Sequence, residues 1–255
     1  MNERMSRMSR PALVAAVVVC LAAGCGNSQP PSRPEVLADL ANEVIVPGYT
    51  DAHEALDSLN RAVGQLCAAP AEARLAEARG ALADARRGWK SIEAVWVGPV
   101  MDRRSWALID WPPNEAEVRE LIDDADGPAI NADYVQQYVG ADQRGLGTAE
   151  LLLGGDLVSL PGRTCDYLGS VAAVAEKEMR AVLALWVEAD AAEELTEDGV
   201  DLLVNDAVFL TRRMSDMELG AALGAFDRDA DLEAVIEGPS GLGIQDGLAL
   251  SLIHI

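Results

Sequence analysis

Two carboxylates stand in sequence surroundings that could build a chemical site. Glu150 lies in the stretch QRGLGTAELLLGGD, residues 143–156, and Glu93 lies between Trp89 and Trp96. Apolar neighbours on both sides predict that each carboxylate is partly buried. A buried carboxylate needs a partner, which is a cation, a hydrogen-bond donor or a metal ion. An ion pair is the simplest alternative to a metal, and the candidate partners in the sequence are Arg103, Arg104 and Arg144.

Other chemical groups are sparse in this chain. There are 2 histidines, His53 and His254, and no His-x-x-x-His motif, pair of Cys-x-x-Cys motifs or glycine-rich phosphate loop. The usual sequence signatures of zinc, redox and nucleotide sites are therefore absent. His53 falls on a predicted helix, where we expect an ordinary solvent-facing residue. Glu93 and Glu150 remain as the candidate site residues.

Helical periodicity dominates the elements that must position these side chains. Four segments repeat apolar residues at alternating spacings of four and three, the pattern of a helix that buries one narrow stripe. No run of alternating β-branched residues competes with this pattern, so we expect an all-α helical bundle. The four stripes are 52-56-59-63-66, 75-78-82-85-89-92-96, 168-172-175-179-182-186 and 203-207-210-214-217-221.

Two shorter helices and one irregular segment complete the prediction. We expect a helix from Glu35 to Ile45 that ends at Pro47, and another over 114–123 with Asn114 as N-cap and Glu117 as its reciprocal partner. Between Trp96 and Asn114, the segment VGPVMDRRSWALIDWPP is too irregular for a long helix. Irregular segments on a helical scaffold often carry sites. Its tryptophans, Trp106 and Trp111, either belong to such a site or plug the end of the bundle.

The N-terminus has the pattern of a bacterial lipoprotein signal. Three arginines precede an apolar run that ends in LAAGC, which resembles a lipobox. We expect residues 1–24 to be cleaved, Cys25 to be lipidated, and 25–34 to form a proline-rich tether. Gly26, rather than aspartate, resembles the pattern sent to the outer membrane, facing the periplasm. The alternative is an uncleaved anchor helix, although the apolar run is short of the length that spans a bilayer.

The net charge limits the kinds of ligand that the protein can bind, and the cysteines allow a disulfide. Removing 1–24 takes away three arginines and Glu3, which leaves 17 basic and 41 acidic residues and a net charge of −24. Such a chain repels nucleic acid, so we expect no nucleic-acid partner, while cations and basic partners are allowed. Cys67 and Cys165 can form a disulfide in the oxidising envelope. The alternative is two buried free thiols.

Several motifs resemble the imelysin family in order and approximate spacing. They are VIVPGY, LCAAP, RRGWKSIEAVWVGPV, IDWPP and RGLGTAELLLGG, within residues 44–155. The resemblance implies an all-helical cell-envelope protein of two bundles, often a lipoprotein, with a link to iron uptake in some members. The family hallmark Gly-x-His-x-x-Glu falls on Gly145, Gly147 and Glu150, so that glycine replaces the histidine. By this resemblance, Glu93 and Glu150 are the carboxylates that would form a motif or metal site.

The missing histidine changes the function that the resemblance implies. Histidine and glutamate three apart share one helix face and can hold one ion, whereas a hydrolytic zinc site needs three protein ligands and a water. We therefore expect a binding protein that captures a cation, an iron-associated ligand or a partner protein in the envelope. If Glu93 and Glu150 hold a metal, a hard divalent or ferric cation, bound weakly, suits two carboxylates best. A metal-dependent peptidase and a structural lipoprotein with a decayed site remain as alternatives.

The C-terminus ends in LSLIHI, residues 250–255. These residues can be back-translated as CTG TCT CTT ATA CAC ATC, the end sequence of a transposon used as a sequencing adapter. We expect them to be an artefact, which leaves an imelysin-like helical domain over 35–249 whose second bundle is incomplete. On this hypothesis His254 is not a natural residue.

Overall fold

The computed structural model of this chain describes residues 30–156, 158, 160, 162–188, 195, 199–215, 220 and 224. The chain divides into two compact units after Val36, and the fold described below is that of the second, Leu37–Ile255. In the described residues, helices are the regular elements, beside one isolated β-bridge. The predicted all-α fold class is confirmed. The predictions for the signal peptide, Cys25 and residues 250–255 fall outside the described residues.

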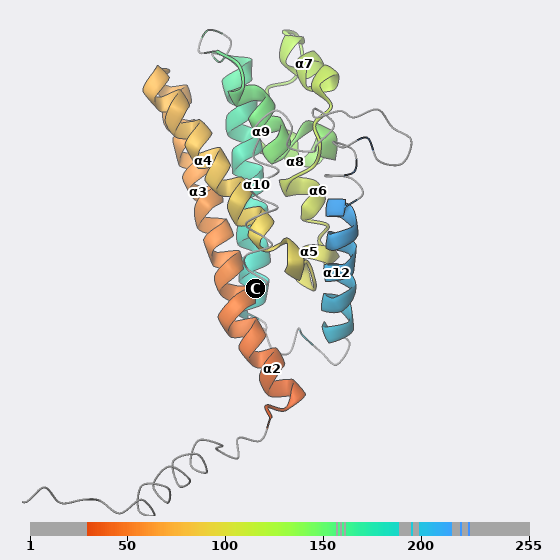
Figure 1. The fold of residues 1–255 in the computed structure, drawn as a ribbon. Coiled ribbons are helices and arrows are strands. Elements are labelled where there is room, and N and C mark those ends of the chain that lie inside the picture. Colours follow the sequence, from red (N-terminus) through yellow and green to blue (C-terminus); the bar gives the residue numbers. More distant parts are fainter. Residues whose placement is uncertain are drawn as a thin grey trace, which may run out of the picture. The chain divides into compact units, whose positions relative to one another are not determined.

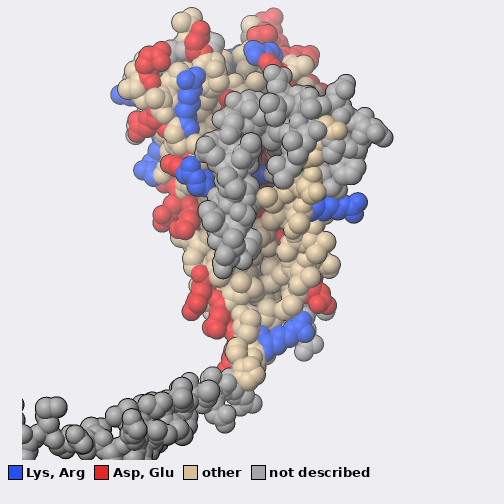
Figure 2. Space-filling view, viewed as in Figure 1, with Lys and Arg blue, Asp and Glu red and all other residues tan. Residues whose placement is uncertain are grey.

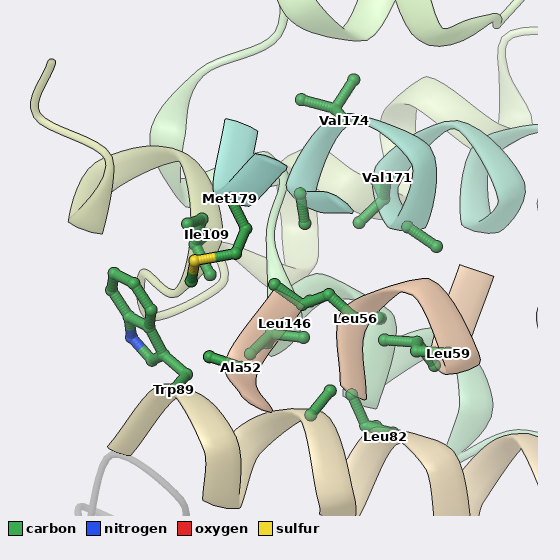
Figure 3. Close-up of a cluster of buried hydrophobic side chains, with 14 of the residues drawn as sticks. Ala52, Leu56, Leu59, Leu82, Trp89, Ile109, Leu146, Val171, Val174 and Met179 are labelled. Carbon is green, nitrogen blue, oxygen red and sulfur yellow. The ribbon is translucent and has the colours of Figure 1, made fainter. Parts of the chain in front are cut away.

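Three long helices form the core of the fold. They are α3 (Val46–Ala68), α4 (Glu72–Ser91) and α10 (Arg163–Glu188), and α3 packs along both of the others (Figure 1). Their apolar stripes are buried as the spacing predicts. Figure 3 shows the side chains of the three helices meeting, with Ile109 and Leu146 between them. The buried stripe residues include Ala52, Leu56, Leu59, Leu75, Leu82, Trp89, Leu168, Ala172, Met179 and Trp186.

The prediction that a helix ends at Pro47 is wrong. The helix α2 (Arg33–Leu40) continues through a π-helical turn, η1 (Ala41–Ile45), directly into α3. In that turn the Val46 N–H donates to the Ala41 carbonyl, five residues earlier. A wider turn accommodates proline, which has no N–H for the next bond and whose ring crowds the preceding turn. Pro47 therefore lies inside a continuous helical segment.

The helix predicted to reach Trp96 is shorter than its stripe. The helix α4 ends at Ser91, and the Ile92 N–H bonds the Trp89 carbonyl three residues back. A 3-10 turn, η2 (Glu93–Val95), follows, then the four-residue helices α5 (Pro99–Asp102) and α6 (Trp106–Ile109). Gly98 has a φ of 57°, a conformation that favours glycine, just ahead of Pro99. The predicted irregular segment is thus confirmed.

Four short elements lie between α6 and α10. They are α7 (Glu115–Asp123), α8 (Ala132–Tyr138), η3 (Ala141–Gln143) and α9 (Leu146–Leu153). The predicted N-cap is confirmed, because Asn114 Oδ1 accepts from the Glu117 N–H at 3.4 Å. The predicted reciprocal bond is wrong, because the Asn114 N–H donates to the Asp142 carbonyl at 2.6 Å. The side chain of Glu117 accepts instead from Gln143.

The helix α12 (Gly199–Arg213) packs against η2. Its predicted stripe is only partly correct. Leu210 is buried, but Ala207 is exposed. The inward positions are instead Leu203, Asp206, Leu210 and Arg213, two of which are charged. The predicted stripe residues Met217 and Ala221 fall outside the described residues.

A disulfide joins the end of α3 to the first turn of α10. The Sγ atoms of Cys67 and Cys165 are 2.05 Å apart, across a sequence separation of 98 residues. In the chain-entropy model, closing a loop of this length stabilises a fold by about 4.7 kcal/mol.

No helix within the described residues combines the length and the apolarity needed to span a bilayer.

Candidate functional site

Arg86 is the cation that partners Glu150. Its guanidinium projects from α4 and is 1% exposed, with Nη2 lying 3.2 Å from Glu150 Oε2 and 3.3 Å from Asp110 Oδ1. Asp110 follows α6 and Glu150 lies in α9, so three elements meet at one buried guanidinium. Two carboxylates around one cation satisfy the requirement that buried charges be paired. We call Arg86, Asp110 and Glu150 the Arg86 cluster.

The arginines proposed from sequence pair elsewhere. Arg103 forms a bidentate pair with Glu178, through Nε at 2.8 Å and Nη2 at 2.7 Å. These hydrogen bonds raise the pKa of Arg103. Arg144 Nη1 donates to the carbonyls of Val135 and Gln136, and burial lowers its pKa. The expectation that they would partner Glu93 or Glu150 is wrong, because α10 and α8 supply their acceptors.

Two glycines let the 109–113 segment lie directly against α9. Gly145 is the N-cap of α9 with a φ of 85°, and it forms the β-bridge with Asp110. A Cβ at Gly145 would lie 2.6 Å from the Ile109 carbonyl oxygen. At Gly147 a Cβ would lie 2.7 Å from the Trp111 carbonyl oxygen and 2.9 Å from Pro113 Cδ. Glycine at 147 is therefore required by close backbone packing, and a histidine there would need this segment to move.

Glu93 is partnered by two cations. Its side chain is 3% exposed, Lys90 Nζ lies 3.5 Å from Oε2, and Arg213 of α12 forms an ion pair with Oε1. The Arg213 guanidinium also lies 5.4 Å from the centroid of the Trp96 ring. This is within the range of a cation–π contact. Glu93 thereby ties the end of α4 to α12.

The two predicted carboxylates face different cavities. Glu93 lines one of about 400 Å³, and Glu150 lines another of about 540 Å³ beside α7. We call the first the tryptophan cavity, because four of the five tryptophans of the chain line it. The ring centroids of Trp89 and Trp96 are 4.8 Å apart. The cavity is lined by Trp89, Lys90, Glu93, Trp96, Met101, Trp106, Asp110, Trp111, Pro112, Asp206, Phe209 and Arg213.

The tryptophans of the irregular segment are walls of this cavity. Trp106 and Trp111 lie 5.1 Å apart between ring centroids, and Trp111 is 39% exposed at the rim. Of the two alternatives for these residues, the geometry therefore favours a site. An apolar cavity of this volume with a few polar groups is typical of small-molecule sites.

Asp206 is the polar group of α12 that faces the tryptophan cavity. Its Oδ2 accepts from the Trp96 N–H at 3.0 Å, and it forms no ion pair with any residue that the structure describes. Burial raises the pKa of Asp206 to about 6, although the hydrogen bond from Trp96 acts in the opposite direction. Burial and the nearby Asp206 charge also raise the pKa of Tyr49. Carboxylates with raised pKa values in clefts are candidates for functional groups.

His53 is not the plain surface residue predicted from sequence. Its Nε2 lies 3.0 Å from Glu176 Oε1, and its side chain is 23% exposed. Because α3 packs along α10, a position on the edge of the α3 stripe meets an acidic residue of α10. His254 falls outside the described residues.

Sequence reasoning missed Arg86, Asp206 and Arg213. Arg86 and Lys90 widen the α4 stripe by one position, and Asp206 and Arg213 are interleaved with Leu203 and Leu210 on α12. Charged residues at core-facing spacing were the available signal. Such residues are rarely buried without a partner, so two of them on one helix face indicate a charged partner opposite.

The residues present do not fit a hydrolytic metal centre. In the part of the chain that the structure describes, no group of three or more His, Cys, Asp or Glu side chains converges. Glu150 and Glu93 each lie beside a cationic group, Arg86 and Lys90 respectively, which would repel a metal ion bound to the same carboxylate. A catalytic zinc site needs three such ligands and an open position. We derive no metal-dependent step from this geometry.

Comparison with known proteins identifies the family. The imelysin family model matches residues 45–241. An imelysin-like protein from Psychrobacter arcticum 273-4 has a similar structure, with a TM-score of 0.69, 23% identity, and coverage of 85% of this chain and 71% of that one. A protein from Parabacteroides distasonis ATCC 8503, called an iron-regulated protein A precursor, gives a TM-score of 0.69, 19% identity and coverage of 88% and 73%. No curated protein matches this chain. Since the family model covers most of the sequence, the chain belongs to the imelysin family.

Proposed function

We propose that this imelysin-family chain is an envelope-anchored binding protein that takes a small ligand into the tryptophan cavity and does not cleave peptides. The observation that carries the proposal is the cavity of about 400 Å³ walled by four tryptophans and Phe209. Large aromatic surfaces in a concave site are what a ligand needs to bury most of its area. The charged groups at its base, Lys90, Glu93 and Arg213, are already paired and provide a fixed polar floor.

The Arg86 cluster supports binding over catalysis. The Arg86 guanidinium, whose Nη2 lies 3.2 Å from Glu150 Oε2, would repel a metal ion bound to the same carboxylate, although Oε1 has no hydrogen-bond partner among the described residues. Gly147 contributes no side chain, and its surroundings leave no room for one. Glu150 therefore serves to hold α9 against α4 and the 109–113 segment.

Anchoring in the envelope is the second part of the proposal. The lipobox-like LAAGC, ending at Cys25, and the disulfide between Cys67 and Cys165 both suit an exported lipoprotein. One structural neighbour is called an iron-regulated precursor, which supports an exported, iron-responsive protein as the biological setting. Incorporation of labelled palmitate into the wild-type chain, lost in Cys25→Ala, would test this part.

The cavity can be tested with a neutral apolar probe. Purified mature domain is titrated with Nile red, and we expect enhanced dye fluorescence that Trp111→Ala weakens several-fold. Tyr138→Ala, which removes a 73% exposed aromatic outside the cavity, is the matched control. Dye binding that is unaffected by Trp111→Ala would contradict the proposed site. A peptide library incubated with the protein and added Zn²⁺ should remain uncut, and cleavage abolished by a chelator would restore the peptidase alternative.

A further inference from the structure

Asp206 places a negative charge at an aromatic wall. Its Oδ2 accepts one hydrogen bond, from the Trp96 N–H, and it lines the same cavity as Trp106, Trp111 and Phe209. A carboxylate has room for several donors on its two oxygens, so one hydrogen bond leaves most of its acceptor capacity unused. A half-buried carboxylate without a cation destabilises the fold. A ligand that brings a positive charge to Asp206 would offset this cost.

The cations of the cavity do not compensate Asp206. Lys90 and Arg213 are both ion-paired with Glu93, and Arg213 lies over the Trp96 ring. Asp110, the remaining carboxylate of the lining, is paired with Arg86. Among the described residues that line the cavity, Asp206 is the charged side chain for which no ion pair is seen. Anionic ligands would meet this charge unfavourably, whereas a cation would be attracted by it.

The tryptophan rings favour the same kind of ligand. The face of an aromatic ring carries a negative quadrupole that attracts cations, most strongly in tryptophan, and quaternary ammonium groups are recognised by cages of such rings. Trp96, Trp106 and Trp111 provide this surface, whereas Trp89 is fully buried, and Arg213 over Trp96 already shows one cation–π contact in this cavity. The protein is also strongly acidic, with a formal net charge of −22, which raises the local concentration of cations. Figure 2 shows acidic side chains on the described surface, with basic ones among them.

We infer that the tryptophan cavity selects an organic cation, whose ammonium-type group lies over the tryptophan rings and against the Asp206 carboxylate. This inference rests on the proposed binding function and specifies its ligand class. The apolar body of the ligand contacts Trp106, Trp111 and Phe209, while Asp206 supplies the counter-charge. Metal ions are not selected, because a bare metal gains little from tryptophan walls and finds one carboxylate.

A matched pair of ligands tests the charge requirement. Choline and 3,3-dimethylbutan-1-ol have nearly the same shape, and only choline carries a positive charge. Binding is measured by titration calorimetry and by the intrinsic fluorescence of the cavity tryptophans, at low ionic strength. We expect choline to bind at least about tenfold more tightly than the alcohol, because a desolvated cation–π contact and a counter-ion act together.

Asp206→Asn is the decisive variant. Asparagine keeps an oxygen that can accept from the Trp96 N–H but removes the charge, so the fold is preserved and the preference for choline should disappear. Asp201→Asn removes an exposed carboxylate from the same helix and should keep the preference. Equal binding of the two ligands to the wild type, or equal losses in both variants, would overturn the inference. Nile red binding that persists in that case leaves the proposed function standing, whereas absent Nile red binding contradicts the proposed function itself.

Discussion

The two ends of α4 lie in contrasting environments. Towards its N-terminus, α4 buries Leu75, Ala78 and Leu82 in an apolar interface, and it packs along α3. At its C-terminus, Arg86 and Lys90 are as buried as those residues, yet each forms an ion pair. Burial of an apolar side chain stabilises a fold by itself, whereas a buried charge destabilises it unless its partner is present. The three-helix core therefore supplies stability, and the part that includes η2, α5, α6 and α12 supplies the tryptophan cavity with its charged groups.

Removing the buried charge of Arg86 from the C-terminal end of α4 should have the largest effect on stability. Arg86→Leu leaves Asp110 and Glu150 buried without their cation, which should lower the free energy of unfolding by about 3–5 kcal/mol. Urea unfolding of the oxidised protein at neutral pH measures this loss. Adding Asp110→Asn and Glu150→Gln should recover part of it. A loss below about 1 kcal/mol would mean that the cluster is solvated and that the contrast between the ends of α4 is wrong.

A mutation in the apolar three-helix core should lower stability without changing Nile red binding. Leu59→Ala in the centre of α3 creates a cavity at a fully buried site and should cost about 2–5 kcal/mol. Its affinity for Nile red should remain that of the wild type under conditions where both are folded, since Leu59 is not a wall of the tryptophan cavity. Weaker dye binding in the folded variant would show that the two parts are coupled.

Replacing glycine by alanine should destabilise the protein at Gly147 in α9 and stabilise it at Gly80 in α4. Gly147→Ala forces a Cβ against the Trp111 carbonyl and Pro113, which should cost about 1–3 kcal/mol. Gly80→Ala, on the exposed face of α4 with no atom within 4 Å of the new Cβ, should instead stabilise by about 0.5–1 kcal/mol. Thermal unfolding of both variants measures the difference. Stabilisation in both would show that the 109–113 segment is free to move.

Asp206→Asn should have a small effect on stability, and that effect should depend on pH. A folded pKa of about 6 lies above the usual 3.8, so the contribution of Asp206 to stability is present below about pH 4 and is lost as pH rises through 6. Asparagine should therefore raise stability by about 1 kcal/mol near pH 7.5, after allowance for partial exposure, and by little near pH 4. Melting temperatures at both pH values, with Asp201→Asn as control, measure the effect. An equal gain at both pH values would mean that the change in stability does not come from the ionisation of Asp206.

The core helices were predictable because one physical effect decides them. Leu56, Leu59 and Met179 are buried where their spacing requires, since a stripe of apolar residues has only one way to leave water. The end of α4 was not predictable in the same way. Ile92 and Trp96 continue the apolar spacing, but the chain turns at Ser91, and the hydrogen bond from Trp96 to Asp206 is made across 110 residues of sequence.

The sequence predicted the two carboxylates of the candidate site but not the cations that pair with them. Glu93 and Glu150 are both partly or fully buried and both need a cation, as their apolar neighbours indicate. Their cations, Arg213 and Arg86, come from helix faces that meet only in three dimensions. Asp206 lies on a stripe interpreted from its apolar members alone, so its charge was overlooked. Interactions within one helix can be found from spacing, whereas the pairing of charges between helices requires the packing itself.

The contact between Gly147 and residues 111–113 constrains the order in which this sequence can change. Any substitution at 147 meets the Trp111 carbonyl oxygen and Pro113 before its own chemistry has an effect. A variant that gains a side chain at 147 must first acquire changes that shift the segment, and those changes would also move Trp111, a wall of the tryptophan cavity. Gaining a ligand at α9 and keeping the aromatic wall are thus competing outcomes, and mutations at 147 and at 111–113 should be strongly non-additive.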